Sequence, residues 1–186
     1  MIVCAGASES FEFAKSIGIG LVEPAINLTN TVSNTMPKWI LFVGTAGSYG
    51  SIKVGSICLC QNAVNIEISS LLELSYTPIN TSVITKLPEH TNTLTDTNNI
   101  LTDVVCNSSN FITKDSAMAD KFIKMGIDIE NMELYSVFSV ARKFDIPCAG
   151  LLYVTNLCDT NAHNDFIKNH ETAKKALIKL IKTANF

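Results

Sequence analysis

Arginine is almost absent from this sequence, because Arg142 is the single arginine among 14 basic residues in a chain of 186. Charged residues make up only 17% of the chain, and the formal net charge at pH 7 is -3. Proteins that bind nucleic acid through its phosphates concentrate Lys and Arg on one face. The scarcity of positive charge therefore excludes nucleic acid as an expected partner.

Long apolar segments are missing as well. No uninterrupted hydrophobic run approaches the about 20 residues that a helix needs to cross a bilayer. The N-terminal stretch MIVCAGASESFEF has no basic residue ahead of its short apolar run and soon reaches Glu9 and Glu12. A secretory signal peptide has the opposite order of features. We therefore expect a soluble, cytoplasmic protein without a membrane partner.

The six cysteines show no pattern typical of a metal site or of a disulfide framework. Cys58 and Cys60 are the closest pair, and no second pair or histidine cluster accompanies them. In a cytosolic chain such thiols stay reduced and pack as small hydrophobic side chains. The sequence predicts neither a metal site nor a bound cofactor.

Hydrophobic residues make up 47% of the chain, which is enough for one domain, residues 1–186, with a substantial core. Several apolar runs lack the alternation of a sheet with one solvated face; the strand-like runs are Ile2–Ala7, Leu21–Leu28, Trp39–Ala46, Ser56–Asn62, Val104–Cys106 and Pro147–Thr155. Apolar residues recur with helical spacing in three other segments, which are Asp115–Met125, Met132–Phe144 and Asn164–Thr183. Strands mixed with helices in this way predict an α/β fold.

The segment Thr77–Thr102 departs from this pattern, since it is rich in Thr and Asn and contains Pro78 and Pro88. Three interpretations fit the composition. It is a long loop, a short strand at Ser82–Lys86 with a mobile arm, or a lid. The sequence leaves all three open.

A row of very small residues, Gly44-Thr45-Ala46-Gly47, follows the apolar run Trp39–Val43. One interpretation is a tight turn at the end of a strand. The other is a binding site where a ligand approaches the backbone, and where peptide N–H groups and the Thr45 hydroxyl hold an anion or polar oxygens. The row is not a P-loop, because no Gly-Lys-Ser/Thr follows, and it is not a dinucleotide-binding turn.

A second informative stretch, Asn131–Asp159, places Met132-Glu133 at the start of an apolar helix and Thr155-Asn156 at the end of a strand. A carboxylate in a first helical turn interacts favourably with the helix dipole, or it holds the hydroxyls of a ligand. Together with VCNSSNFIT at 105–113 and the GTAG and KVGSI motifs, the stretch resembles the nucleoside phosphorylase/nucleosidase family. The resemblance implies a three-layer α/β/α sandwich around a mixed, partly barrel-like central sheet, and a homo-oligomer, with a dimer favoured.

The resemblance implies a site for a purine nucleoside with Glu133 and Asn156 as its catalytic residues. Met132 and Glu133 would hold the ribose hydroxyls, and the carboxylate would bind them more strongly as positive charge develops on the sugar. Asn156 would face N7 of the purine. An amide cannot act as a general acid but can donate a hydrogen bond, which favours a 6-oxopurine as the leaving base.

The remaining implied contacts line the sugar and the base. Gly6 and Thr45 would lie on the side of the attacking phosphate or water, and Phe111 would stack on the base beside Ile112. Ala46 and Gly47 complete the floor of the site.

The attacking nucleophile is the open question of this resemblance. Phosphorylases of the family hold phosphate with arginines, and Arg142 is placed on a helix away from the small residues. Nucleosidases use a glutamate after the first strand to activate water, and Glu9 or Glu12 would serve. Because Asn156 suits chemistry without a general acid, we first expect phosphorolysis, with phosphate as co-substrate. The alternatives are hydrolysis and a catalytically degenerate protein that binds nucleosides.

Overall fold

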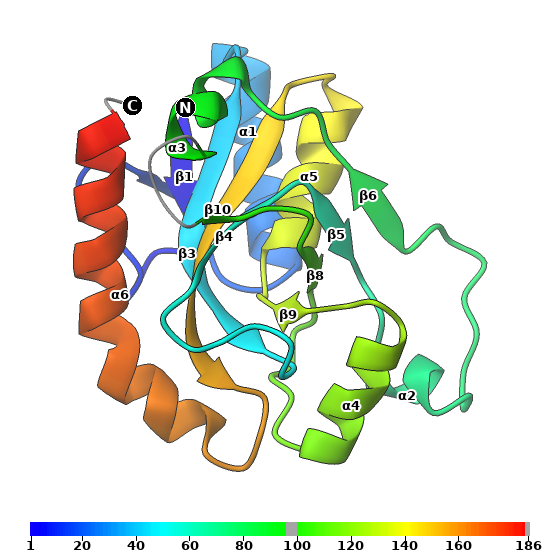
Figure 1. The fold of residues 1–186 in the computed structure, drawn as a ribbon. Helices are drawn as coiled ribbons and strands as arrows, with labels where there is room; N and C mark the ends of the chain where they lie inside the picture. The colour runs from blue at the N-terminus through cyan, green and yellow to red at the C-terminus, as the bar shows by residue number, and fades with distance from the viewer. Residues whose placement is uncertain (96–99, 185–186) are drawn as a thin grey trace.

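The computed structural model describes residues 1–95 and 100–184, without the side chains of His90 and Thr95. Within these residues, helices flank one mixed sheet of ten strands (Figure 1). The strands are β1 (Ile2–Cys4), β2 (Lys15–Ser16), β3 (Ile40–Ser48), β4 (Ile57–Cys60), β5 (Asn62–Val64), β6 (Ser82–Ile84), β7 (Ile100–Leu101), β8 (Val105–Asn107), β9 (Ile129–Glu130) and β10 (Cys148–Leu157). The helices are α1 (Val22–Thr35), α2 (Ile68–Leu71), the 3-10 turn η1 (Glu89–Thr91), α3 (Asn92–Thr95), α4 (Ser116–Lys124), α5 (Leu134–Lys143) and α6 (Ala162–Ala184).

The parallel pair β3 and β10 forms the centre of the sheet. Alternate residues of β3 face opposite layers: Phe42 packs in the core with α1 and α5, whereas Leu41 and Val43 pack in the core with α6. All residues of β3 are buried, which explains why its sequence is a continuous apolar run. Figure 1 shows α6 on one face of the sheet and α1 and α5 on the other. The predicted α/β sandwich is confirmed.

The strand order closes part of the sheet into a ring. The order is β6-β5-β8-β9-β3-β10-β4-β7, and β4 and β5 lie near its opposite ends although only Gln61 separates them in the sequence. The chain therefore bends at Gln61 and carries the sheet around from β4 to β5. This confirms the partly barrel-like character of the central sheet.

One predicted strand is wrong, because Leu21–Leu28 belongs to helix α1. Its buried residues are Pro24, Leu28, Thr31 and Val32, a spacing that matches one face of a helix. Pro24 lies in the first turn, where the missing N–H costs nothing, and Glu23 beside it favours a helix start. The apolar run looked like a strand because it covers only the first half of the helix, and the second half is rich in Asn and Thr.

The other expected elements are confirmed. The predicted strands form β1, β3, β4 with β5, β8 and β10, and the three predicted helices form α4, α5 and α6. Their ends are shifted by no more than two residues, except that β1 ends at Cys4, three residues before the predicted Ala7. Of the three interpretations left open for the segment Thr77–Thr102, the short strand is present as β6, and Leu94 of α3 is fully buried in the core with α6. Residues 96–99 of this segment lie outside the described residues.

The six cysteines are free and buried, as expected. Cys58 and Cys60 both face the core with α1 and α5, and burial raises the pKa of the Cys58 thiol to about 12. Among the described residues, none of the helices has the length and apolar character needed to span a membrane. The same residues contain no cluster of three or more His, Cys, Asp and Glu side chains suited to a metal ion.

Candidate active site

A cavity of about 290 Å³ lies where the ends of β3 and β10 meet the start of α5 and the loop after β1. This volume is at the lower end of the range of roughly 300–1,000 Å³ that is common for small-molecule sites. The cavity lining includes every residue predicted for the site: Gly6, Thr45, Ala46, Gly47, Phe111, Ile112, Met132, Glu133 and Asn156. The structure thus brings these residues from distant parts of the sequence around one space.

The small residues Gly44 to Gly47 do not form a turn, so that interpretation is wrong. They lie inside β3, which continues to Ser48. A Cβ on Gly44 would lie 3.0 Å from the Phe42 ring and 3.3 Å from the Glu9 Oε2 atom. A Cβ on Gly47 would lie 2.9 Å from the Asn156 Nδ2 atom. The glycines therefore make room for the side chains that form the cavity wall.

A β-bulge directs the end of β10 toward the cavity. The register shifts between Val154 and Asn156, so Asn156 pairs with Gly47; such bulges re-aim side chains near active sites. The Asn156 Oδ1 atom accepts a hydrogen bond from the Thr155 hydroxyl at 2.9 Å, and Nδ2 donates to the Leu157 carbonyl at 3.0 Å. These two hydrogen bonds fix the orientation of the Asn156 amide, with Oδ1 on the Thr155 side and the donor Nδ2 on the Leu157 side.

Glu133 is the buried carboxyl at the opposite wall, with 3% of its surface exposed. It immediately precedes α5, which begins at Leu134, so it lies before the first turn and not within it as expected. Its Oε1 atom accepts a hydrogen bond from the Gly20 amide at 2.9 Å. Burial raises the pKa of Glu133 to about 7, the Gly20 hydrogen bond opposes the rise, and the nearby charge of Glu9 adds to it.

Asn131 holds Glu133 in place, a role that the sequence analysis missed. Its Oδ1 atom accepts hydrogen bonds from the backbone amides of Glu133 at 2.9 Å and Leu134 at 3.0 Å. Its Nδ2 atom donates to the carbonyl oxygen of Thr45 at 2.9 Å. Asn is a preferred residue for satisfying the free amides of a helix start, and an Asn two residues ahead of Glu133 was the available signal.

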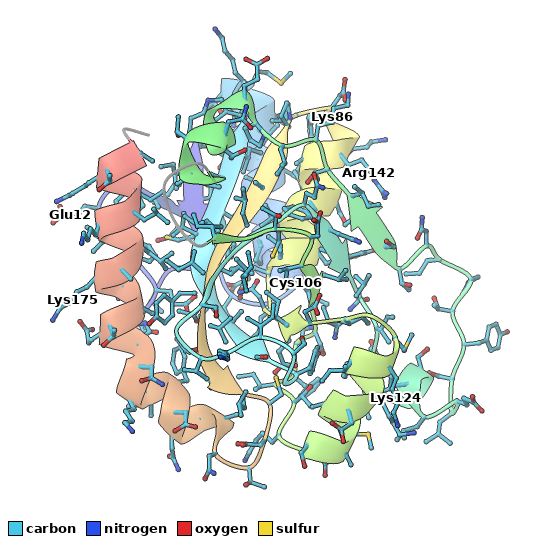
Figure 2. All side chains as sticks on the ribbon, viewed as in Figure 1. Glu12, Lys86, Cys106, Lys124, Arg142 and Lys175 are labelled. Carbon is cyan, nitrogen blue, oxygen red and sulfur yellow. The ribbon has the colours of Figure 1, made fainter. Side chains whose placement is uncertain are left out.

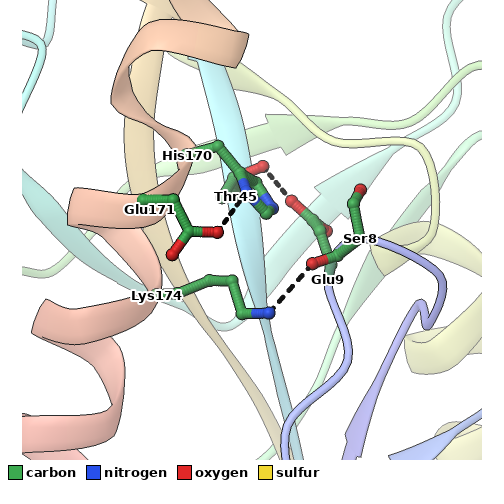
Figure 3. A network of polar contacts seen from close by, with 6 residues as sticks. All are labelled: Ser8, Glu9, Thr45, His170, Glu171 and Lys174. Carbon is green, nitrogen blue, oxygen red and sulfur yellow. Dashed lines mark hydrogen bonds and ion pairs between the residues drawn. The ribbon is translucent and has the colours of Figure 1, made fainter.

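Glu9 lies on the cavity wall beside β3, where its carboxylate accepts a hydrogen bond from the Thr45 hydroxyl (Figure 3). Burial raises the pKa of Glu9, while the Thr45 hydrogen bond and the charges of His170 and Lys174 hold it down. Glu12, the other glutamate considered for this role, is exposed and does not line the cavity. The structure thus places only Glu9 of this pair at the site.

A third carboxyl, Glu130, lines the cavity next to Asn156 and was not predicted. Its Oε2 atom accepts a hydrogen bond from the Tyr49 hydroxyl at 3.0 Å, and Oε1 accepts from the Thr113 amide at 2.9 Å. Burial raises the pKa of Glu130, and these hydrogen bonds oppose the rise. Glu130 therefore ties the segment that carries Phe111 and Ile112 to the centre of the sheet.

Phe111 and Ile112 form an apolar part of the lining, although their side chains are 82% and 54% exposed. The loop before them is anchored to α1, because the Leu21 amide donates to the Asn110 Oδ1 atom at 2.9 Å. Exposed aromatic side chains at the edge of a cavity offer a flat surface for a ring-shaped ligand.

Positive charge is scarce around the cavity. Within the described part of the chain, its lining contains three glutamates and neither lysine nor arginine. Arg142 is exposed near the C-terminal end of α5 and outside the lining (Figure 2). The site therefore lacks the bidentate cation that binds phosphate most effectively.

Three kinds of comparison with known proteins agree. The family model of the phosphorylase superfamily matches residues 7–184. A 5′-methylthioadenosine/S-adenosylhomocysteine nucleosidase of Buchnera aphidicola subsp. Schizaphis graminum is 25% identical over 187 residues, which cover 89% of this chain and 74% of that protein.

Solved structures share the fold at lower identity. A mutant futalosine hydrolase of Helicobacter pylori has a TM-score of 0.81 at 17% identity, covering 98% of this chain and 96% of that one. A mutant MTAN of Helicobacter pylori, solved with 5′-methylthioadenosine in its active site, has a TM-score of 0.79 at 20% identity, covering 92% of this chain and 78% of that one.

Proposed function

The chain belongs to the phosphorylase superfamily, and we propose that within it the protein hydrolyses the N-glycosidic bond of a purine nucleoside. The proposal departs from the phosphorolysis that the sequence first suggested. The relatives with the same fold are named nucleosidases and a futalosine hydrolase. The composition of the cavity wall supports the same choice.

The observation that carries the proposal is the Glu9 carboxyl, bonded to Thr45 on a cavity wall without arginine or lysine among the described residues. In the cavity lining, as far as the structure describes the chain, a phosphate anion would face three carboxyl groups and neither lysine nor arginine. Two unit charges of like sign about 4 Å apart repel by about 4 kcal/mol at an effective dielectric of about 20. Water carries no such penalty. A carboxyl whose pKa is raised by burial is also a better base for deprotonating water.

In the proposed reaction, Glu9 takes a proton from the water as its oxygen bonds to C1′ of the sugar. The C1′–N9 bond breaks, and its electron pair leaves with the purine. The purine anion then takes a proton from solvent, and Glu9 returns its proton to solvent, so the carboxylate is regenerated. Glu133 binds the ribose hydroxyls, and as a carboxylate it stabilises the positive charge that develops on the sugar. Met132 packs beside the sugar.

Asn156 receives the departing base in this scheme. Its amide donates a hydrogen bond toward N7 but supplies no proton, so the base must tolerate leaving as an anion. A 6-oxopurine does so more readily than adenine, and we therefore propose a 6-oxopurine nucleoside as the preferred substrate. Phe111 stacks on the base, and Ile112 contacts its edge.

Phosphate dependence tests the reaction type. The protein is dialysed free of phosphate and incubated with inosine, adenosine, 5′-methylthioadenosine and futalosine, with and without phosphate, and the released base and sugar are quantified by chromatography. We expect base release without phosphate, with the sugar recovered in its free reducing form. Release that requires phosphate and yields a sugar 1-phosphate would overturn hydrolysis in favour of phosphorolysis.

Isothermal titration separates the remaining alternative. A protein that binds inosine or hypoxanthine tightly and releases no base under either condition would be a binding protein, and the proposed activity would be rejected.

The Glu9→Gln variant tests the role of Glu9, because the proposed hydrolysis requires the Glu9 carboxylate. We expect this variant to bind nucleoside and to lose base release by at least about 100-fold, whereas Glu12→Gln should behave as wild type.

A further inference from the structure

His170 of α6 is a buried imidazole outside the cavity lining that none of the steps above uses. Only 8% of its surface is exposed. The Nδ1 atom lies 3.8 Å from the Glu171 Oε1 atom on the same helix. The Nε2 atom is fully buried and has no hydrogen-bond partner within the described residues. Because buried polar atoms normally have partners, this nitrogen calls for an explanation.

The surroundings of His170 lead to Glu9. Figure 3 shows the imidazole between Glu171 and the Glu9–Thr45 pair. The charge of His170 acts on the Glu9 carboxyl and favours its ionised form. The ring also packs at a tilt against Phe166, with centroids 5.1 Å apart, and Phe166 lines the cavity. His170 thus lies directly behind the wall that carries Glu9.

Lys174, one helical turn further along α6, approaches the same loop. Its Nζ atom donates a hydrogen bond to the Ser8 carbonyl oxygen at 3.2 Å and lies 5.8 Å from the centre of the Phe11 ring. Its charge also favours the ionised form of Glu9. Helix α6 therefore presents His170 and Lys174, spaced i and i+4 on one face, toward the Ser8-Glu9 segment.

We propose that His170 is a positioning residue for hydrolysis: from α6 it supports Glu9 as the ionised proton acceptor, and Lys174 assists it. The inference rests on the proposed function, since it concerns the group that activates water. It also accounts for a site that has Arg142 outside the cavity. Positive charge reaches Glu9 from α6, while the cavity lining itself carries, among the described residues, no lysine or arginine that would bind phosphate.

The groups around Glu9 favour either its neutral or its ionised form. Burial favours the neutral acid at Glu9, and Glu133 across the cavity adds like-charge repulsion between the two carboxyls. The Thr45 hydroxyl from β3 and the charges of His170 and Lys174 on α6 act in the opposite sense. Glu171, beside His170, is exposed, and its Oε1 atom lies 3.8 Å from the Nδ1 atom of the imidazole. Removing His170 therefore shifts Glu9 toward its protonated, inactive form.

The test compares the pH dependence of kcat/KM for wild type, His170→Phe, His170→Gln and Lys174→Gln, with Lys175→Gln as the matched control on the exposed side of α6. We expect the acidic limb of His170→Phe to move to higher pH by about one unit, which lowers the rate on that limb about tenfold and leaves the alkaline plateau nearly intact. His170→Gln keeps a hydrogen-bond donor without a charge. In this variant the alkaline plateau of kcat/KM should stay at the wild-type level, and the acidic limb should move to higher pH as in His170→Phe. Lys174→Gln should shift the limb in the same direction by less, and Lys175→Gln should match wild type.

A second measurement does not depend on activity. Carbon-13 NMR titration of the glutamate carboxyls, with Glu9 assigned through Glu9→Gln, follows the pKa of Glu9 directly, and we expect it to rise in His170→Phe. An unchanged Glu9 titration and acidic limb, with only a lower melting temperature, would assign His170 a structural role and overturn the inference. Absence of base release by the wild type would instead overturn the proposed function, whichever way the titration turns out.

Discussion

The Asn131 side chain donates a hydrogen bond to the Thr45 carbonyl oxygen at 2.9 Å and accepts one from the Glu133 amide at 2.9 Å. One buried amide thus joins the strand that carries the proposed water-side residues to the residue proposed to bind the sugar. The spacing between Thr45 and Glu133 depends on this bridge.

Replacing Asn131 with Ala should therefore reduce both stability and activity. The change removes the Asn131 hydrogen bonds to the Thr45 carbonyl and to the Glu133 and Leu134 amides at the start of α5. We expect a loss of about 2–3 kcal/mol in the free energy of unfolding, measured by urea denaturation. Asn30→Ala, at an exposed position of α1, is the control and should change stability by less than about 0.5 kcal/mol. Equal effects of the two variants would contradict the bridging role.

The Glu133 carboxyl should make the protein less stable as the pH rises. Its pKa is raised from 4.5 to about 7 by burial, so between these values the folded state binds a proton that the unfolded state has released. The free energy of unfolding therefore falls as pH increases through this window. The shift corresponds to roughly 3 kcal/mol at neutral to alkaline pH.

The Glu133→Gln variant isolates this contribution, because Glu9 and Glu130 are unchanged in it. Its stability relative to wild type should improve by roughly 3 kcal/mol between about pH 4 and pH 8, followed by denaturant titrations at each pH. The same variant should lose base release by at least about 100-fold. A stability difference that does not vary with pH would contradict the raised pKa.

Exchanging Asn156 for Asp should change the preferred base. A protonated Asp donates a proton to the departing purine as a general acid, which adenine needs more than a 6-oxopurine does. We expect the ratio of adenosine to inosine cleavage to rise by at least about tenfold, given the 10²–10⁴-fold effects typical of such groups. Asn156→Ala removes the donor without adding an acid and should slow both substrates without changing their ratio. A constant ratio in Asn156→Asp would indicate that residue 156 does not face the base.

Phe111→Ala should weaken nucleoside binding without affecting stability. The ring is 82% exposed, so its loss should change the free energy of unfolding by less than about 0.5 kcal/mol. Loss of stacking on the base should cost about 1 kcal/mol, or roughly fivefold in the dissociation constant for hypoxanthine. Tyr76, which is 93% exposed and outside the cavity lining, provides the matched control as Tyr76→Ala. Comparable binding by both variants would remove Phe111 from the base site.

Elements and residues could be predicted from the sequence where a local pattern reflects burial or belongs to a motif. The runs that became β3 and β10 were recognisable because both of their faces are covered. Glu133 and Asn156, which line the cavity, could be named from the sequence because they stand in stretches that resemble a family. The strand predicted at Leu21–Leu28 was wrong because that window is too short to show the helical spacing that continues to Val32.

The supporting residues of the site were harder to predict, since their partners are distant in the sequence. Asn131 and Thr45 are 86 positions apart, and Glu130 and Tyr49 are 81 apart. His170 lies in the segment Asn164–Thr183, which the sequence predicts only as a helix, and its place near Glu9 depends on how α6 packs on the sheet. Such pairings arise from tertiary packing, which no local pattern encodes.

The closure of the sheet at Gln61 has a consequence for how copies of this chain meet. In the described residues the strands left at the margins of the sheet are short: β6 has three residues, and β7 and β2 have two each. Short edge strands offer a neighbouring molecule few unpaired backbone N–H and C=O groups, which limits strand addition and aggregation. We therefore expect copies that associate to do so through side chains on helices and loops, with each sheet remaining separate.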